Sequence, residues 1–285
     1  MPELEGVRHH ALDVRGARLH VAELGSGPPV VLLHGWPQHW WTWRAIMALL
    51  ADRHRVIAPD LRGFGWSEAT PRGYRKDELA ADVAGILDAL DVERAHVVGH
   101  DWGGVVGMLL CLDHADRVER FVPMNTAHVW PTLPLWRIPK QVGGFSYQGV
   151  LASPLLGPRV GSSRFVLRRI FGLVSDQSDA VLEPFDVFAA RFQDPARARA
   201  VQQVYRSFLL YEYPAWLRGR YRDRRLTTPT LWLHGTGDPV ITPGLFKDIG
   251  EHADDVRIEY LDGCGHFPQE EQPALVAGHL REFFG

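Results

Sequence analysis

Short runs of apolar, often β-branched residues recur along the chain and are separated by segments with helical spacing. Four of these runs precede the middle of the chain, at Val30–His34, Arg55–Asp60, Ala95–His100 and Arg120–Asn125. Runs without polar alternation are typical of strands that are buried on both faces of a sheet. Ahead of them, the segment ALDVRGARLHVAEL alternates around Arg15 and Gly16, which predicts a hairpin.

The segments between these runs have the spacing of amphipathic helices. In KDELAADVAGILDAL, residues 76–90, the apolar residues Leu79, Val83 and Ile86 fall on one face, and acidic residues occupy the first turn. Acidic side chains interact favourably with the dipole at a helix N-terminus, and one apolar face is typical of a helix that packs against a core. The alternation of strands and helices predicts an α/β fold with a mostly parallel sheet flanked by helices.

The alternation stops near residue 129 and resumes near residue 218. The segment between is rich in Pro, Gly and aromatic residues and then becomes helical, as in RARAVQQVYRSFLLYEY. Strand patterns return at Thr230–Gly235 and Val256–Leu261, and a last amphipathic helix is predicted over Pro273–Phe284. We therefore expect an α/β core domain of residues 1–128 and 218–285, with a helical cap of residues 129–217 inserted after the sixth strand. Such an insertion would cover the carboxyl ends of the strands, where open α/β sheets bind ligands.

Composition and charge narrow the possible partners. The chain has 285 residues, of which 46% are hydrophobic and 23% charged, and a formal net charge of −3. This charge gives no field that would attract nucleic acid or an anionic membrane, and the basic cluster RGRYRDRR has no nucleic-acid motif beside it. Two cysteines make no disulfide framework, and the N-terminal residues lack the apolar segment of a signal peptide. We expect a cytoplasmic monomer or homodimer, with neither nucleic acid nor a membrane as partner.

The segment AHVVGHDWGGVVGMLL predicts a strand, a tight turn and a helix. Residues Gly99 to Gly103 follow the pattern in which two glycines flank a central nucleophile, so that the chain turns sharply and lifts that side chain above the sheet. The central residue is Asp101. A carboxylate that attacks a saturated carbon forms an alkyl ester, which must then be hydrolysed. We therefore expect a substrate with a saturated carbon that bears a leaving group.

Two further residues follow Asp101 in the chain order of nucleophile, acid and histidine that is typical of this motif. Asp238 comes directly after a predicted strand in LHGTGDPV, and His266 lies in a loop after the next strand, in LDGCGHFPQEE. We predict that Asp238 orients His266, and that neutral His266 deprotonates the water that attacks the ester. Asp262 is interpreted as a turn residue, and Asn125 is set aside as the acid because it is not a carboxylate.

Five motifs together resemble those of α/β-hydrolases, and more closely those of soluble epoxide hydrolases. They are HGWPQHWWTWR, DLRGFGWS, GHDWGG, GTGDPV and GHFPQEEQP. The resemblance covers nearly the whole chain and is weakest in the insertion. In that architecture two backbone N–H groups form an oxyanion hole, and the resemblance assigns this role to Trp36 and Trp102. We also expect His34, Pro37 and Trp102 to contact the substrate, and neither a metal nor a cofactor to take part.

The resemblance implies that the substrates are a small epoxide and water, and that the product is a vicinal diol. It also implies two cap tyrosines that protonate the epoxide oxygen, and the segments FSYQGVLASPLLG and VYRSFL assign this role to Tyr147 and Tyr205. A tyrosine with an ordinary pKa of about 10 is protonated at neutral pH and can donate. Tyr211 and Tyr213, which follow on the same predicted helix, are interpreted as packing residues.

Two other functions remain open. A haloalkane dehalogenase shares the Asp-Trp turn, but it would stabilise a halide with indole or amide N–H donors; Trp102 is one candidate donor, and Trp130 and Trp136 are candidates for a second. A non-catalytic ligand-binding protein of the same fold has no need of a base, so the complete set of nucleophile, acid and histidine argues against it.

Overall fold

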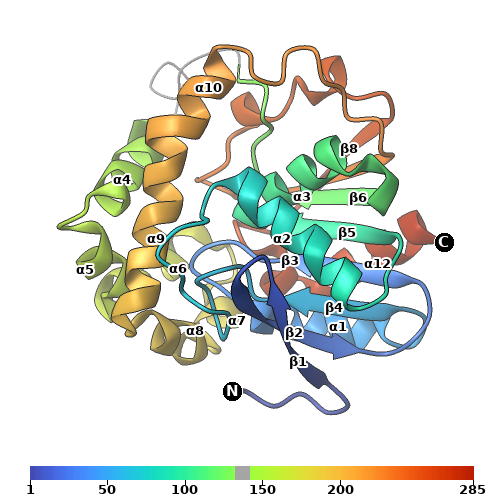
Figure 1. Cartoon of the computed structure of the whole chain (residues 1–285), viewed down its shortest axis with the longest axis horizontal. Coiled ribbons are helices and arrows are strands. Elements are labelled where there is room, and N and C mark those ends of the chain that lie inside the picture. Colours follow the sequence, from blue (N-terminus) through green and yellow to red (C-terminus); the bar gives the residue numbers. More distant parts are fainter. Residues whose placement is uncertain (132–141) are drawn as a thin grey trace.

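An eight-stranded sheet runs through the molecule in the order β1-β2-β4-β3-β5-β6-β7-β8 (Figure 1). The computed structural model describes residues 1–131 and 142–285. The pairs β1–β2 and β2–β4 are antiparallel, and the other neighbouring pairs are parallel. The predicted α/β fold with a mostly parallel sheet is therefore confirmed. The strands are β1 (Arg8–Val14), β2 (Ala17–Leu24), β3 (Pro29–Leu33), β4 (Arg55–Pro59), β5 (Ala95–His100), β6 (Val118–Met124), β7 (Thr230–Gly235) and β8 (Val256–Leu261).

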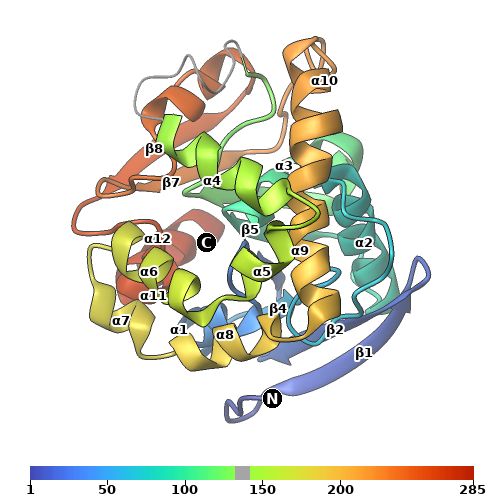
Figure 2. The ribbon, with the colours of Figure 1, turned by 90° about the vertical axis from the view of Figure 1, so that its left-hand side faces the viewer.

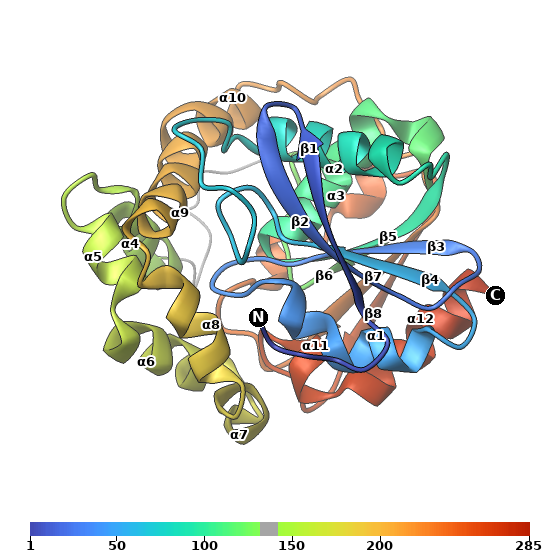
Figure 3. The ribbon, with the colours of Figure 1, turned by 60° about the horizontal axis from the view of Figure 1, so that its bottom comes forward.

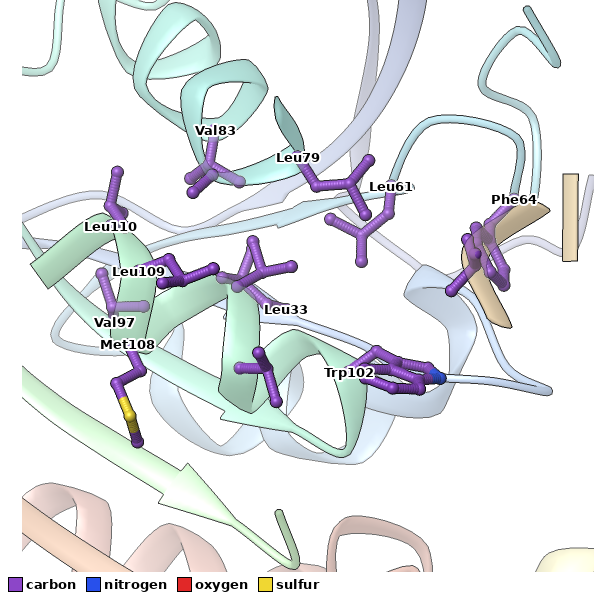
Figure 4. Packing of buried hydrophobic residues seen from close by; sticks show 14 of the residues in the cluster. Leu33, Leu61, Phe64, Leu79, Val83, Val97, Trp102, Met108, Leu109 and Leu110 are labelled. Atoms are coloured by element: carbon purple, nitrogen blue, oxygen red, sulfur yellow. The ribbon is translucent and has the colours of Figure 1, made fainter. Parts of the chain in front are cut away.

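Two layers of helices cover the two faces of the sheet (Figure 3). In β3, Val31 and Leu33 pack with the layer of α2 and α3, whereas Val30 and Leu32 pack with α1 and α12. Figure 4 shows Leu33 beside Leu109 of α3. Full burial of one such side chain contributes about 2 kcal/mol, so the unbroken apolar runs hold both layers. The flanking helices are α1 (Arg44–Leu50), α2 (Lys76–Ala89), α3 (Trp102–Asp113), α11 (Pro268–Glu271) and α12 (Pro273–Phe284).

Between β6 and β7 the described residues form helices and connecting loops. Figures 2 and 3 show these helices gathered beside one end of the sheet. The insertion after the sixth strand is thus helical in its described part, as expected, while its division from the core as a separate domain stays a prediction. The elements are α4 (Val142–Ala152), α5 (Gly157–Ser162), α6 (Arg164–Val174), α7 (Ser178–Leu182), α8 (Phe185–Phe192), α9 (Pro195–Ser207), a π-helical turn η4 (Phe208–Glu212) and α10 (Tyr213–Leu217).

Short 3-10 helices complete the described structure. They are η1 (Trp40–Trp43), η2 (Ala115–Arg117), η5 (Pro243–Leu245) and η6 (Ile249–Glu251).

In the described ranges, no helix is both long and apolar enough to cross a membrane.

The turn between β5 and α3 depends on two glycines that leave no room for a side chain. A Cβ atom added at Gly99 would lie 2.3 Å from the carbonyl oxygen of Gly103, and one added at Gly103 would lie 2.1 Å from that of Leu33. Both distances are far shorter than any van der Waals contact, and both neighbours are backbone atoms that cannot rotate away. The glycines therefore allow α3 to begin one residue after β5 ends, with Asp101 at the apex.

We predict that Gly103→Ala lowers the free energy of unfolding by about 3 kcal/mol or more, because the new methyl group overlaps the backbone of β3. Chemical denaturation of the purified variant measures this change. Gly278→Ala is the matched control, since Gly278 also lies in a helix and has no heavy atom within 4 Å of the added Cβ. That control should be stabilised by up to about 1 kcal/mol. Equal stability of the two variants would contradict the tight packing described for the turn.

Candidate active site

Asp101 occupies the sharp turn between β5 and α3. Its backbone has φ 50° and ψ −121°, a conformation that side-chain-bearing residues rarely adopt and that is often retained at functional sites. Its Oδ2 accepts the backbone N–H of Trp36 at 3.0 Å, and the backbone N–H of Trp102 also donates to the carboxylate. The two donors predicted for the oxyanion hole thus converge on the Asp101 side chain.

Asp238 and His266 come from the loops that follow β7 and β8. His266 Nδ1 lies 2.8 Å from Asp238 Oδ2, so Nε2 is the ring nitrogen that remains to take a proton from water. The other oxygen, Oδ1, accepts the backbone N–H groups of Val240 at 2.7 Å and Ile241 at 3.1 Å. These bonds fix the carboxylate plane, and the carboxylate in turn fixes the orientation of the imidazole.

Burial and charge together set the protonation of these three groups. Burial raises the pKa of the Asp101 carboxyl to about 6, although the charge of His266 and the two backbone N–H groups oppose the rise. Burial alone would lower the pKa of His266, but the carboxylates of Asp238 and Asp101 outweigh it and the pKa is raised. Burial would raise the pKa of Asp238, but the charge and hydrogen bond of His266 outweigh it and the pKa is lowered. Asp238 is therefore a persistent anion, whereas Asp101 titrates near pH 6.

A cavity of about 370 Å³ brings the polar groups together. Asp101, His266 and Tyr147 line it, and its remaining lining is almost wholly apolar. Pro37, which the sequence placed at the substrate, is part of this wall. The cavity therefore suits an uncharged organic molecule whose reactive centre meets a few polar groups. The other lining residues are Trp36, Ile170, Leu173, Val174, Pro239, Val240 and Phe267.

Tyr147 of α4 and Tyr205 of α9 lie side by side near Asp101. Their ring centroids are 6.1 Å apart, and their hydroxyl groups hydrogen-bond to each other. Burial raises the pKa of both phenols well above the ordinary value of 10, and the charge of Asp101 raises them further. Both tyrosines are therefore protonated at neutral pH, and both feel the charge of the same carboxylate.

Several known proteins are similar to this chain in sequence and fold. The α/β hydrolase fold family matches residues 28–273. A soluble epoxide hydrolase from Corynebacterium sp. (strain C12) is 31% identical over 98% of this chain and 97% of its own. Epoxide hydrolase A from Mycobacterium tuberculosis is 33% identical over 95% of both chains. A solved structure of the epoxide hydrolase CorEH without ligand superposes with a TM-score of 0.87, at 29% identity over 98% of each chain.

The chain belongs to the soluble epoxide hydrolase family of α/β-hydrolases. The resemblance to soluble epoxide hydrolases that the five sequence motifs indicated is therefore confirmed over nearly the whole chain.

The prediction that His34 contacts the substrate is wrong for this α/β-hydrolase. The His34 side chain has no exposed surface. Its Nδ1 bonds to the carbonyl oxygen of Gly35 at 3.0 Å, and its Nε2 accepts the backbone N–H of Leu61 at 3.0 Å. With both ring nitrogens occupied by the main chain, His34 braces the loop that carries Trp36 and has no polar atom left for a ligand.

The aromatic residues considered for other roles are also placed by the structure. The indole N–H of Trp130 donates to the carbonyl oxygen of Tyr221 at 2.7 Å, so it is not available to a halide. Trp136 lies outside the described residues. Tyr213 is buried, as the packing interpretation requires, but that interpretation is wrong for Tyr211, which is 61% exposed on the π-helical turn.

Two residues of the site escaped the sequence analysis. Asn125 was set aside because it is no carboxylate, but its Nδ2 donates to Asp238 Oδ2 at 2.7 Å and to the carbonyl oxygen of Gly265 at 3.0 Å. His100, directly before the nucleophile, lies with Nε2 2.6 Å from the carbonyl oxygen of His266. Both hold the acid and base loops against the core. In the sequence, the only signal for a role of Asn125 or His100 was its position at the end of a predicted strand.

The hydrolase site offers no obvious place for a metal. Within residues 1–131 and 142–285, no group of three or more His, Cys, Asp or Glu side chains is arranged to hold a metal ion.

We predict that Asp101→Asn is more stable than the wild type at neutral pH. A carboxyl whose pKa rises on folding, here from 3.8 to about 6, binds its proton more tightly in the folded state, so stability falls as the pH rises through that interval. Asn has no proton to lose, and its free energy of unfolding should exceed that of the wild type by up to about 3 kcal/mol above pH 6. The difference should shrink towards about pH 4.

Urea unfolding at several pH values measures this difference. Asp262→Asn, at an exposed turn, is the matched control and should follow the wild type at each pH. A stability gain in Asp101→Asn that is the same at acid and neutral pH would contradict the assignment of a costly buried charge to Asp101.

Proposed function

We propose that this enzyme converts an epoxide to a vicinal diol through a covalent ester on Asp101. The observation that carries the proposal is the pair of hydrogen-bonded phenols, Tyr147 and Tyr205, near the half-buried carboxylate of Asp101. An epoxide needs a nucleophile at carbon and an acid at oxygen. The site supplies both, with the acid held in the protonated form. Residues 129–217 would act as the cap, since the described helices of this insertion carry both tyrosines.

In the first step, an oxygen of Asp101 attacks an epoxide carbon. The carbon–oxygen bond of the ring breaks, and the oxygen takes a proton from the tyrosine pair, which is left with one phenolate. Desolvation favours this step, because a carboxylate with a pKa of about 6 is mostly ionised at neutral pH yet poorly stabilised. General-acid assistance of this kind contributes roughly 100-fold or more to a rate.

In the second step, the loss of charge at Asp101 prepares His266 as a base. The Asp101 carboxylate is one of the charges that raise the pKa of His266, so formation of the ester removes that contribution and favours neutral imidazole. His266 then takes a proton from a water molecule, which attacks Cγ of Asp101. The resulting oxyanion would accept the backbone N–H groups of Trp36 and Trp102, and one such donor contributes about 3 kcal/mol.

Collapse of the tetrahedral intermediate completes the cycle. The bond between Cγ and the ester oxygen, which came from Asp101, breaks. That oxygen receives the proton from His266 and leaves as one hydroxyl of the diol. Asp101 remains as a carboxylic acid whose proton returns to the phenolate through water. The sum of the steps is one epoxide and one water molecule converted to one diol.

The cavity supports a substrate that is small and uncharged. Apart from Asp101 and His266, the residues that line it carry no charged side chain, so an ionised substituent would be desolvated without a partner. Haloalkane dehalogenation is the alternative reaction for the same nucleophile. It is less well supported, because the phenol of Tyr147 lines the cavity together with Asp101 and the indole of Trp130 is already bonded to the main chain.

We predict diol from styrene oxide and no bromide from 1-bromobutane when the wild type is assayed with both. Asp101→Ala should abolish diol formation, and the double variant Tyr147→Phe/Tyr205→Phe should slow it at least about 100-fold. Chromatography of the diol and titration of halide give the two rates.

Three results would point elsewhere. Halide release that survives loss of both phenols would assign a dehalogenase, and diol formation that survives Asp101→Ala would mean direct attack by water. Neither product from the folded wild type would favour a ligand-binding protein.

A further inference from the structure

Lys76 is a fully buried lysine between the α/β core and the helical layer, by which we mean the inserted helices α4 to α10. Its side chain has no exposed surface. Nζ donates to Glu212 Oε2 at 2.8 Å and to the carbonyl oxygen of Val204 at 2.7 Å, and it lies 3.4 Å from Ser207 Oγ. Replacement of a buried ion pair by apolar residues is often neutral or stabilising. Stability alone therefore does not explain why a lysine stands here.

Glu212 joins the start of α2 to the helical layer. Its Oε1 accepts the backbone N–H of Lys76 at 2.7 Å, and its Oε2 accepts both Lys76 Nζ and the hydroxyl of Ser207 at 2.9 Å. Glu212 ends the π-helical turn Phe208–Glu212 that follows α9. Such turns are rare and often occur at functional sites. This turn brings Glu212 back toward α9, where it pairs with a lysine of the core.

The ion pair of Lys76 and Glu212 is connected to Tyr205, the candidate acid, through neighbouring groups. Lys76 Nζ is 4.4 Å from the ring centroid of Trp102, and that ring meets the Tyr205 ring edge-on at 5.5 Å. The carbonyl group that Nζ binds belongs to Val204, the residue before Tyr205. Lys76 thus fixes Tyr205 in two ways, through the backbone next to it and through the indole against which it packs.

We propose that Lys76 and Glu212 are positioning residues that hold the Tyr205 hydroxyl at the epoxide oxygen during ring opening. This inference rests on the proposed function, because it assumes that Tyr205 is an acid. The ammonium group lies over the face of the indole, and Lys76 is not one of the residues that line the cavity, so it can hold the indole without contacting the substrate. Loss of the pair would leave Asp101, Asp238 and His266 in place but free Tyr205 to shift. Ring opening should therefore suffer and ester hydrolysis should not.

The test is a double-mutant cycle between the ion pair and the phenol. Lys76→Met/Glu212→Gln removes both charges with little change in volume, and it is made with Tyr205 present and in Tyr205→Phe. Rapid quenching and intact-protein mass spectrometry follow formation and decay of the covalent adduct with styrene oxide in a single turnover. With Tyr205 present, adduct formation should slow about 10- to 100-fold, since a misplaced reacting group costs up to about 100-fold. Adduct decay should change by less than about threefold.

In the Tyr205→Phe background, the same replacements should change adduct formation by less than about threefold, because the group they position is gone. Arg62→Met/Asp82→Asn is the matched control, since it removes another buried ion pair, which joins the loop after β4 to α2 through two bonds of 2.7 Å. It should leave both rates close to those of the wild type. If Lys76→Met/Glu212→Gln does not fold, Glu212→Gln alone should show the same pattern at smaller size.

Equal slowing of adduct formation in the two backgrounds would overturn the inference, as would equal slowing of formation and decay. Either result would leave the proposed function intact, because the wild type would still form the adduct and the diol. Absence of adduct and diol in the wild type would overturn the proposed function and this inference together.

Discussion

The partial burial of one carboxylate, that of Asp101, is the constraint on which the rest of the site depends. Asp101 sits at a turn where α3 approaches β3 and β5 so closely that only glycine fits at positions 99 and 103. Desolvation of its charge raises the pKa of Asp101. Two backbone N–H groups and His266 offset part of the cost. The part of the desolvation cost that is not offset makes Asp101 a reactive anion, and conversion of the carboxylate to a neutral ester removes that cost.

The sequence predicted those parts of the structure that local patterns determine. The unbroken apolar run Val30–His34 predicted β3 because a strand packed on both faces needs apolar residues at every position, and both helix layers do pack on it. The turn of Gly99 to Gly103 predicted Asp101 at the apex for a similar reason, since the sterics of that turn involve neighbours in the chain. The chain order of nucleophile, acid and histidine then predicted Asp238 and His266. In the structure, Asp238 Oδ2 and His266 Nδ1 lie 2.8 Å apart.

The sequence could not predict contacts between distant segments. His34 was expected at the substrate, but its ring nitrogens bond to the main chain of Gly35 and Leu61 and its side chain is buried. Asn125 was set aside on its chemistry, although an amide N–H is the donor that the Asp238 carboxylate needs. The pairing of Lys76 with Glu212, 136 residues away, leaves no local pattern at either residue. Such contacts exist only once the helical layer is folded onto the core.

The central claim is that Asp101 itself supplies an oxygen to the product. A single turnover in ¹⁸O-labelled water, with enzyme in excess over epoxide, tests it most directly. Attack of water at Cγ of Asp101 predicts that the first diol carries no label and that the peptide containing Asp101 gains one ¹⁸O atom. Label in the diol of the first turnover, with an unlabelled Asp101 peptide, would contradict the account and show that water attacks the epoxide directly.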